Sequence, residues 1–115
     1  MFEKRRLKKH GTKGKATVVD AQQHPKITTN DYRKYDFIVD VHPEDAPAFR
    51  AEVQETFTVG GLKPQAGDVV SVRYDLESRA VMFDLEGDPR YDLKALRAEQ
   101  EASREQLLRE PPAES

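Results

Sequence analysis

Cysteine is absent from this sequence of 115 residues. The chain therefore has no disulfide framework, no thiolate nucleophile and no cysteine-based zinc or iron-sulfur site. Hydrophobic residues make up 37% of the chain and charged residues 35%, a composition low in apolar side chains. We expect one domain, with part of the chain outside its core.

Long apolar runs are also missing. The longest, from Ala80 to Phe83, has four residues, whereas a membrane-spanning helix needs about 20. The opening stretch MFEKRRLKKH is charged and is not followed by the apolar segment of a signal peptide. These features predict a cytoplasmic protein.

Catalytic and metal-binding motifs are absent as well. His10, His24 and His42 lack the spacing of a metal site, and the acids beside His42 are typical of an ordinary loop. Nothing resembles a nucleophile elbow, a P-loop or a dinucleotide-binding glycine motif. The sequence predicts no catalytic residues, no metal, no cofactor and no small-molecule substrate, and so a protein that is not an enzyme.

Charge is distributed unevenly along the chain. Residues 1–15 carry a net charge of +6, whereas residues 16–83 and 84–115 carry −4 each. We expect residues 1–10 to form a basic flexible arm, through which nucleic acid or an anionic membrane could be bound weakly, with Phe2 and Leu7 inserting into lipid. A solvated terminus that promotes solubility is the simpler interpretation, which we favour. The candidate anion-binding residues are Arg5, Arg6, Lys8 and Lys9.

Five segments have the period-two pattern of β-strands. The clearest is residues 35–41, where the inward face comprises Tyr35, Phe37, Val39 and Val41. The other strands are expected at residues 13–20, 49–54, 70–74 and 81–85. The last two form a hairpin that we expect to build the core.

Glu55 has the inward parity of the third strand. A buried carboxylate would need a paired base or hydrogen-bond donors. We expect the strand to end or bend near Gln54, with Glu55 solvated at the end of the sheet. A buried functional acid is the alternative.

Turns rather than helices join the strands, which predicts an antiparallel meander. The expected fold is mainly β: a five-stranded antiparallel barrel-like (OB-like) sheet with one C-terminal α-helix. Residues 93–109 are rich in helix-forming residues, and Asp92 is a suitable N-cap. We assign the barrel-like domain to residues 11–88, the helix to residues 89–110 and a disordered tail to residues 111–115.

Apolar side chains on the outward strand faces would form an exposed patch unless another surface covers them. Leucines of the helix could cover it in cis, which we favour, and a second subunit or another protein could cover it in trans. Five helix positions have heptad spacing, but two of them, Gln100 and Ser103, are polar, which weakens the case for a coiled coil. The candidate partner-binding residues are Ile38, Val69, Met82, Leu93, Leu96 and Leu107.

The sheet itself is a poor candidate for binding nucleic acid. Six of the nine aromatic residues have inward parity, and acids outnumber bases on the outward strand faces. We therefore expect contact with nucleic acid or a membrane surface only through residues 1–15.

Three short motifs carry a resemblance to a known kind of domain. They are a glycine before the first strand, the Pro-x-x-Gly-Asp turn at residues 64–68 and the V-x-V-x-Y-D strand at residues 70–75. Residues 11–86 resemble a small actinobacterial β-barrel domain that often precedes a short C-terminal helical oligomerisation segment. This resemblance implies no catalytic residues. The helix of this chain lacks the glycine-punctuated two-helix pattern of that segment.

The sequence therefore predicts a non-enzymatic protein-interaction or assembly module, which binds a protein partner or itself. The alternative is a weak binder of anionic surfaces through the basic arm. Under the first hypothesis, removal of residues 1–15 leaves function intact, whereas function depends on Leu93, Leu96 or Leu107. Under the second hypothesis, the reverse holds.

Overall fold

The computed structural model describes residues 2–25 and 31–113, and the chain divides into two compact units. The first unit, Met1–Leu85, contains the strands and helix α1 (Phe2–His10), and the second, Glu86–Ser115, contains helix α2 (Leu93–Arg109). Within the described ranges, no helix has the length and apolar character needed to cross a bilayer.

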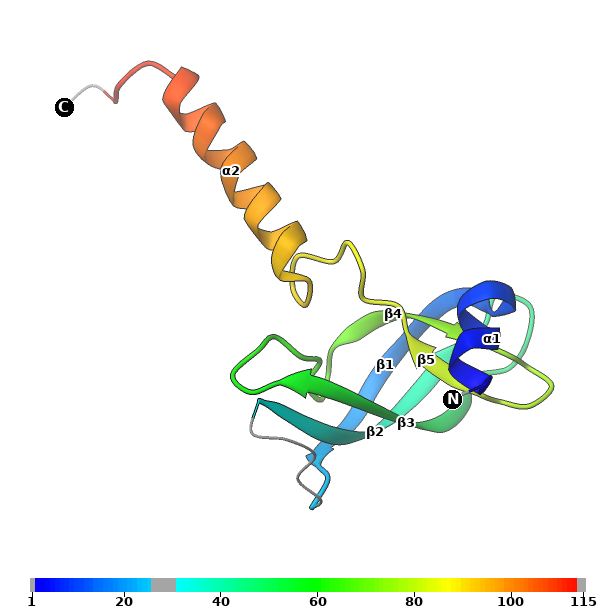
Figure 1. Cartoon of the computed structure of the whole chain (residues 1–115). Helices are drawn as coiled ribbons and strands as arrows, with labels where there is room; N and C mark the ends of the chain where they lie inside the picture. Colours follow the sequence, from blue (N-terminus) through cyan, green and yellow to red (C-terminus); the bar gives the residue numbers. More distant parts are fainter. Residues whose placement is uncertain (1, 26–30, 114–115) are drawn as a thin grey trace. The chain divides into compact units, whose positions relative to one another are not determined.

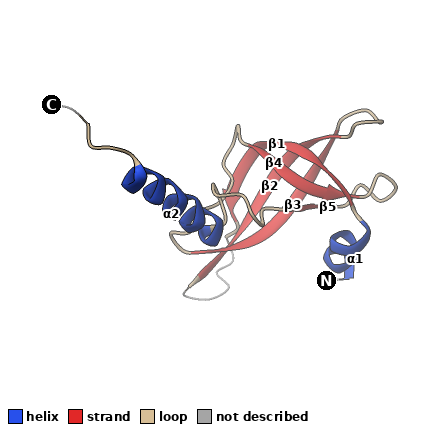
Figure 2. Cartoon of the chain, turned by 90° about the horizontal axis from the view of Figure 1, so that it is seen from above, coloured by secondary structure: helices blue, strands red, loops and turns tan. Residues whose placement is uncertain are grey.

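The first unit is a five-stranded antiparallel sheet that curls into a nearly closed barrel (Figure 1, Figure 2). The order across the sheet is β3-β2-β1-β4-β5, and β5 returns beside β3. The predicted mainly β fold, with five antiparallel strands and a C-terminal helix, is confirmed. The strands are β1 (Thr12–Gln23), β2 (Tyr32–His42), β3 (Phe49–Thr58), β4 (Val69–Tyr74) and β5 (Val81–Phe83).

The predicted meander is wrong, because β4 pairs with β1 rather than with β3. The connection after β3 therefore crosses to the far side of β1. Two backbone hydrogen bonds of 2.8 Å attach it there, from the Gly67 N–H to the Val18 oxygen and from the Val18 N–H to the Asp68 oxygen. Gly67 has a φ of 96°, which a residue with a side chain rarely adopts.

Alternating side chains of the strands fill the barrel, as the period-two pattern predicts. On β2, Phe37, Val39 and Val41 are buried, whereas Ile38 and Asp40 between them are only half-buried. The other apolar side chains of the core are Leu7, Ala16, Val18, Phe49, Val53, Val70, Val72, Tyr74 and Phe83.

The strand β1 is longer than predicted, because it continues through Gln23 and pairs there with Tyr35 of β2. Its register against β2 shifts between Val18 and Asp20, which leaves Val19 as an exposed extra residue. Such a bulge bends a strand and increases its twist. The irregularity therefore helps the central strand to curl around the core.

Residues 2–10 form helix α1, where the sequence analysis expected a flexible arm. Leu7 explains the difference, because its side chain is only 4% exposed and belongs to the core. The Gly11 N–H donates to the Leu7 carbonyl oxygen at 2.8 Å, which ends the helix against the start of β1. A Cβ at Gly11 would lie 2.5 Å from that oxygen, so the turn requires glycine.

Helix α2 begins at Leu93, after the predicted N-cap Asp92. The Asp92 carboxylate accepts hydrogen bonds from the backbone N–H groups of Lys94 and Ala95, and Gly87 N–H donates to it at 2.8 Å. The hydrogen bond from Gly87 is the main cause of the lowered pKa of this carboxyl. The helix is shorter than the predicted range 89–110, and it contains no buried residue.

Candidate interaction surfaces

The three outer-face residues predicted to bind a partner lie on three different strands, and Ala80, the fourth apolar residue of the predicted patch, directly precedes β5. Ile38 on β2 is half-buried, Val69 at the start of β4 is 50% exposed, and Met82 on β5 is half-buried opposite Arg73. Strand β1 separates β2 from β4, and no two of the three residues are paired in register.

Ile38 borders a polar groove across β1, β2 and β3. Its register partners are Asp20 and Glu52, and the groove has a volume of about 240 Å³. Asp36 also lines it, and its Oδ1 is buried without a hydrogen-bond partner. No group of three or more potential ligands in the described part of the chain could hold a metal ion.

Helix α1 is attached to the barrel by polar contacts on both sides of Leu7. Lys4 Nζ lies 3.5 Å from Glu55 Oε1 of β3, and Arg6 Nη2 lies 3.8 Å from Asp75 Oδ2, just after β4. Arg73 Nη1 donates to the Lys8 carbonyl oxygen at 3.0 Å. These contacts hold the basic segment in one place on the barrel.

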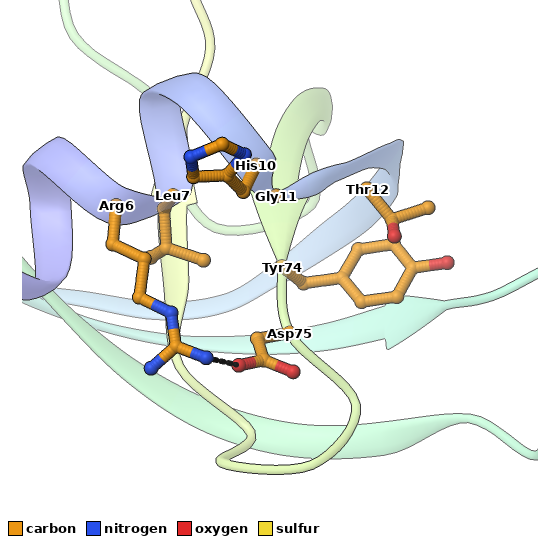
Figure 3. Close-up of a pocket in the computed structure, with 7 residues that line it drawn as sticks. All are labelled: Arg6, Leu7, His10, Gly11, Thr12, Tyr74 and Asp75. Carbon is orange, nitrogen blue, oxygen red and sulfur yellow. Dashed lines mark ion pairs between the residues drawn. The ribbon is translucent and has the colours of Figure 1, made fainter.

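A small cavity lies where α1 meets β1 and the end of β4 (Figure 3). Its volume is about 140 Å³, and the ion pair between Arg6 and Asp75 crosses one side of it. Because the guanidinium already faces a carboxylate, the cavity offers no uncompensated positive charge to a small anion. We assign it no ligand.

Glu55 is where the sequence prediction failed. Strand β3 does not end near Gln54 but continues to Thr58, and the Glu55 side chain is only 21% exposed. Its carboxylate faces Lys4 of α1 and accepts a hydrogen bond from the Phe83 backbone N–H of β5. Glu55 therefore joins α1, β3 and β5, at the edge where β3 and β5 lie side by side without ladder pairing.

Burial raises the pKa of the Glu55 carboxyl, and the Lys4 ammonium and the Phe83 N–H offset only part of that rise. Between the unfolded and the folded pKa, the native state binds a proton that the unfolded state has lost. This carboxyl therefore reduces stability as the pH rises through that window, and the loss is complete above the folded pKa.

We expect Glu55→Gln to gain stability relative to the wild type as the pH rises from about 4 to 7. Glutamine keeps an acceptor for the Phe83 N–H but carries no charge to desolvate. Urea unfolding at several pH values measures the difference, and Glu52→Gln, an exposed carboxyl on the same strand, is the matched control. We expect the stability difference between the control and the wild type not to change with pH. If the difference between Glu55→Gln and the wild type were equally independent of pH, burial of the Glu55 charge would not be the cause.

The predicted anion-binding residues do not act as one set. Arg6 faces Asp75, whereas Arg5, Lys8 and Lys9 are exposed and form no ion pair with any side chain that the structure describes. Leu7 is buried in the barrel and is not available to insert into lipid. The Phe2 side chain lies outside the described residues. Within the described residues of α1, the lysine and arginine side chains that face no carboxylate are therefore Arg5, Lys8 and Lys9.

Helix α2 carries the other candidate residues. Leu93 is 53% exposed, Leu107 is 67% exposed and Leu96 is half-buried. Spacings of three and four residues place them on one face together with Gln100 and Ser103. We call these five residues the α2 stripe.

Sequence reasoning missed the contacts made by Lys4, Leu7 and Glu55. Two signals were present, however: Leu7 is the only apolar residue in the stretch EKRRLKKH, and Glu55 has inward parity. Neither signal alone indicates a contact, and only the fold shows that both residues lie where α1 packs on the barrel.

Comparison with protein-family models, curated proteins and solved structures found no significant match.

Proposed function

We propose that this chain is a non-enzymatic protein-interaction or assembly module, and that α2 is the element that contacts the partner. The observation that carries this proposal is that α2 buries none of its side chains, although three leucines share one face. Isolated helices of about this length are marginal in water, and most helices gain stability by packing an apolar face. A partner surface on the stripe supplies that packing.

The barrel supports this role as a scaffold. Around it the strands follow in the order β1-β2-β3-β5-β4, an order that supports the OB-like interpretation. The side chains of Phe37, Phe49 and Tyr74 pack inward, whereas Tyr32 at the start of β2 is 48% exposed. The inward rings are not available to stack on bases.

A photo-crosslinking amino acid at position 96 of the full chain tests the proposal in the cells that produce it. We expect a covalent adduct with a protein after irradiation. The matched control is position 98, because Ala98 lies on the side of α2 opposite the stripe. Absence of an adduct from position 96, or equal adducts from both positions, would count against α2 as the contact element.

A second candidate is weak binding of nucleic acid or anionic lipid through α1. It is favoured by the exposed side chains of Arg5, Lys8 and Lys9. Deletion of residues 1–15 cannot test it, because that deletion removes Leu7 from the core and the first residues of β1. Arg5→Gln/Lys9→Gln is the suitable variant, titrated with labelled single-stranded DNA or RNA at low and near-physiological salt.

A further inference from the structure

The charges that flank the α2 stripe are sorted by sign. With Leu93 as position a of a heptad, Gln100 and Leu107 are also a, and Leu96 and Ser103 are d. On one flank, the g positions are Glu99 and the uncharged Gln106, and on the other, the two e positions are Arg97 and Arg104. One flank of the stripe therefore carries one negative charge, and the other carries two positive charges.

These three charged side chains are exposed, and none forms an ion pair with another side chain in the part of the chain that the structure describes. The ion pair within α2 joins Glu105 to Arg109 at 4.0 Å, away from both flanks. The flanks are therefore open to charges supplied by a partner.

Sorted charges of this kind are self-complementary in one orientation only. In a parallel pair of helices, position g contacts position e of the following heptad in the partner helix, so Glu99 meets Arg104 of a second copy, twice by symmetry. An antiparallel pair sets e against e and g against g, which brings arginine to arginine and glutamate to glutamate.

The polar layers of the stripe are consistent with the same arrangement. Two Gln100 side chains at position a meet in an in-register pair and can hydrogen-bond to each other, and polar residues at a specify register at a cost in affinity. Ser103 adds a small d layer. A helix pair with such positions is therefore weak and specific in register.

We propose that α2 pairs in parallel and in register with α2 of a second copy of this chain. The inference rests on the proposed function, and it adds the identity of the partner and the direction of its helix.

Disulfide trapping of the full chain tests the geometry. The chain has no cysteine, so Ser103→Cys introduces a single thiol, which faces its own copy at d only in the parallel in-register pair. We expect at least about tenfold more disulfide-linked dimer, in a glutathione buffer, than for the control Ala98→Cys at the outward f position. Equal trapping of the two variants would overturn the proposal.

Charge reversal tests the pairing by sedimentation equilibrium, at concentrations on the order of 100 µM, where a short helix pair with polar layers is populated. We expect Glu99→Arg alone and Arg104→Glu alone each to weaken self-association about tenfold or more. A mixture of the two variants restores every opposite-charge pair, and we expect it to form heterodimers. The parallel pair would be overturned if each single variant self-associated as strongly as the wild type, or if the mixture of the two variants remained monomeric.

The photo-crosslinking experiment separates this inference from the proposed function. An adduct of position 96 with a second copy of the chain supports both. An adduct with a different protein only, and no self-association of the purified chain, overturns the second-copy proposal and leaves the interaction module standing. No adduct from position 96 contradicts the proposed function itself.

Discussion

Phe37→Ala is expected to lower the free energy of unfolding by about 3–5 kcal/mol. Phe37 is 1% exposed, and its ring centroid lies 4.9 Å from that of Phe83 and 5.9 Å from that of Phe57. The three rings come from β2, β5 and β3, so they pack across the edge where β3 and β5 lack ladder pairing. Denaturant unfolding followed by circular dichroism measures the loss.

Leu76→Ala is the matched control, because Leu76 is 50% exposed in the turn after β4. We expect that change to stay within about 0.5 kcal/mol. A loss below about 1 kcal/mol for Phe37→Ala would mean that these rings do not hold the barrel together.

The second large effect is expected at Leu7. Leu7→Ala removes the buried side chain by which α1 packs on the barrel, and we expect a loss of about 2 kcal/mol or more. The amide protons of α1 should also exchange faster with solvent, because the helix depends on this packing rather than on its short sequence. Unfolding curves and native-state hydrogen exchange provide the two measurements.

Arg5→Ala serves as the control for Leu7, since Arg5 is exposed on the opposite side of α1. We expect it to leave both stability and exchange unchanged within about 0.5 kcal/mol. If Leu7→Ala behaved like Arg5→Ala, residues 2–10 would be the flexible arm that their composition suggests.

The strands were predictable because each has one face that is buried in the core and one face that is more exposed to solvent. Each core residue of β2 is separated from the next by a residue of the outer face, and that alternation is visible in the letters alone. The N-cap Asp92 was predictable for a similar reason, since capping depends on residues adjacent in sequence.

Strand order was not predictable, because it depends on which edge of the sheet the third connection crosses. Period-two patterns determine which side chains point inward but carry no information about which strands pair. The pairing of β4 with β1 rests on contacts such as that of Gly67 with Val18, far apart in the sequence.

Helix α1 was missed for a different physical reason. Its seven charged or basic residues suggest a solvated segment, and a single leucine gives no periodicity to recognise. The free energy that fixes it comes from the barrel, mainly through the burial of Leu7. The ion pairs of Lys4 and Arg6 add little, because both basic side chains are more than half exposed.

The predicted apolar patch on the outer face depends on strand pairing in the same way. Residues on different strands are neighbours only when the register brings them together, and the register follows from which strands pair.

The central place of β1 has a consequence for how the protein is made. One of its edges pairs with β2, which follows it directly, but the other pairs with β4, from Thr12 with Tyr74 to Thr17 with Val69. A nascent chain that has released only its first three strands therefore carries an open edge along the middle strand of the future barrel. Until the fourth strand leaves the ribosome, that edge is a template for pairing with neighbouring chains, so aggregation is most probable in this interval of synthesis.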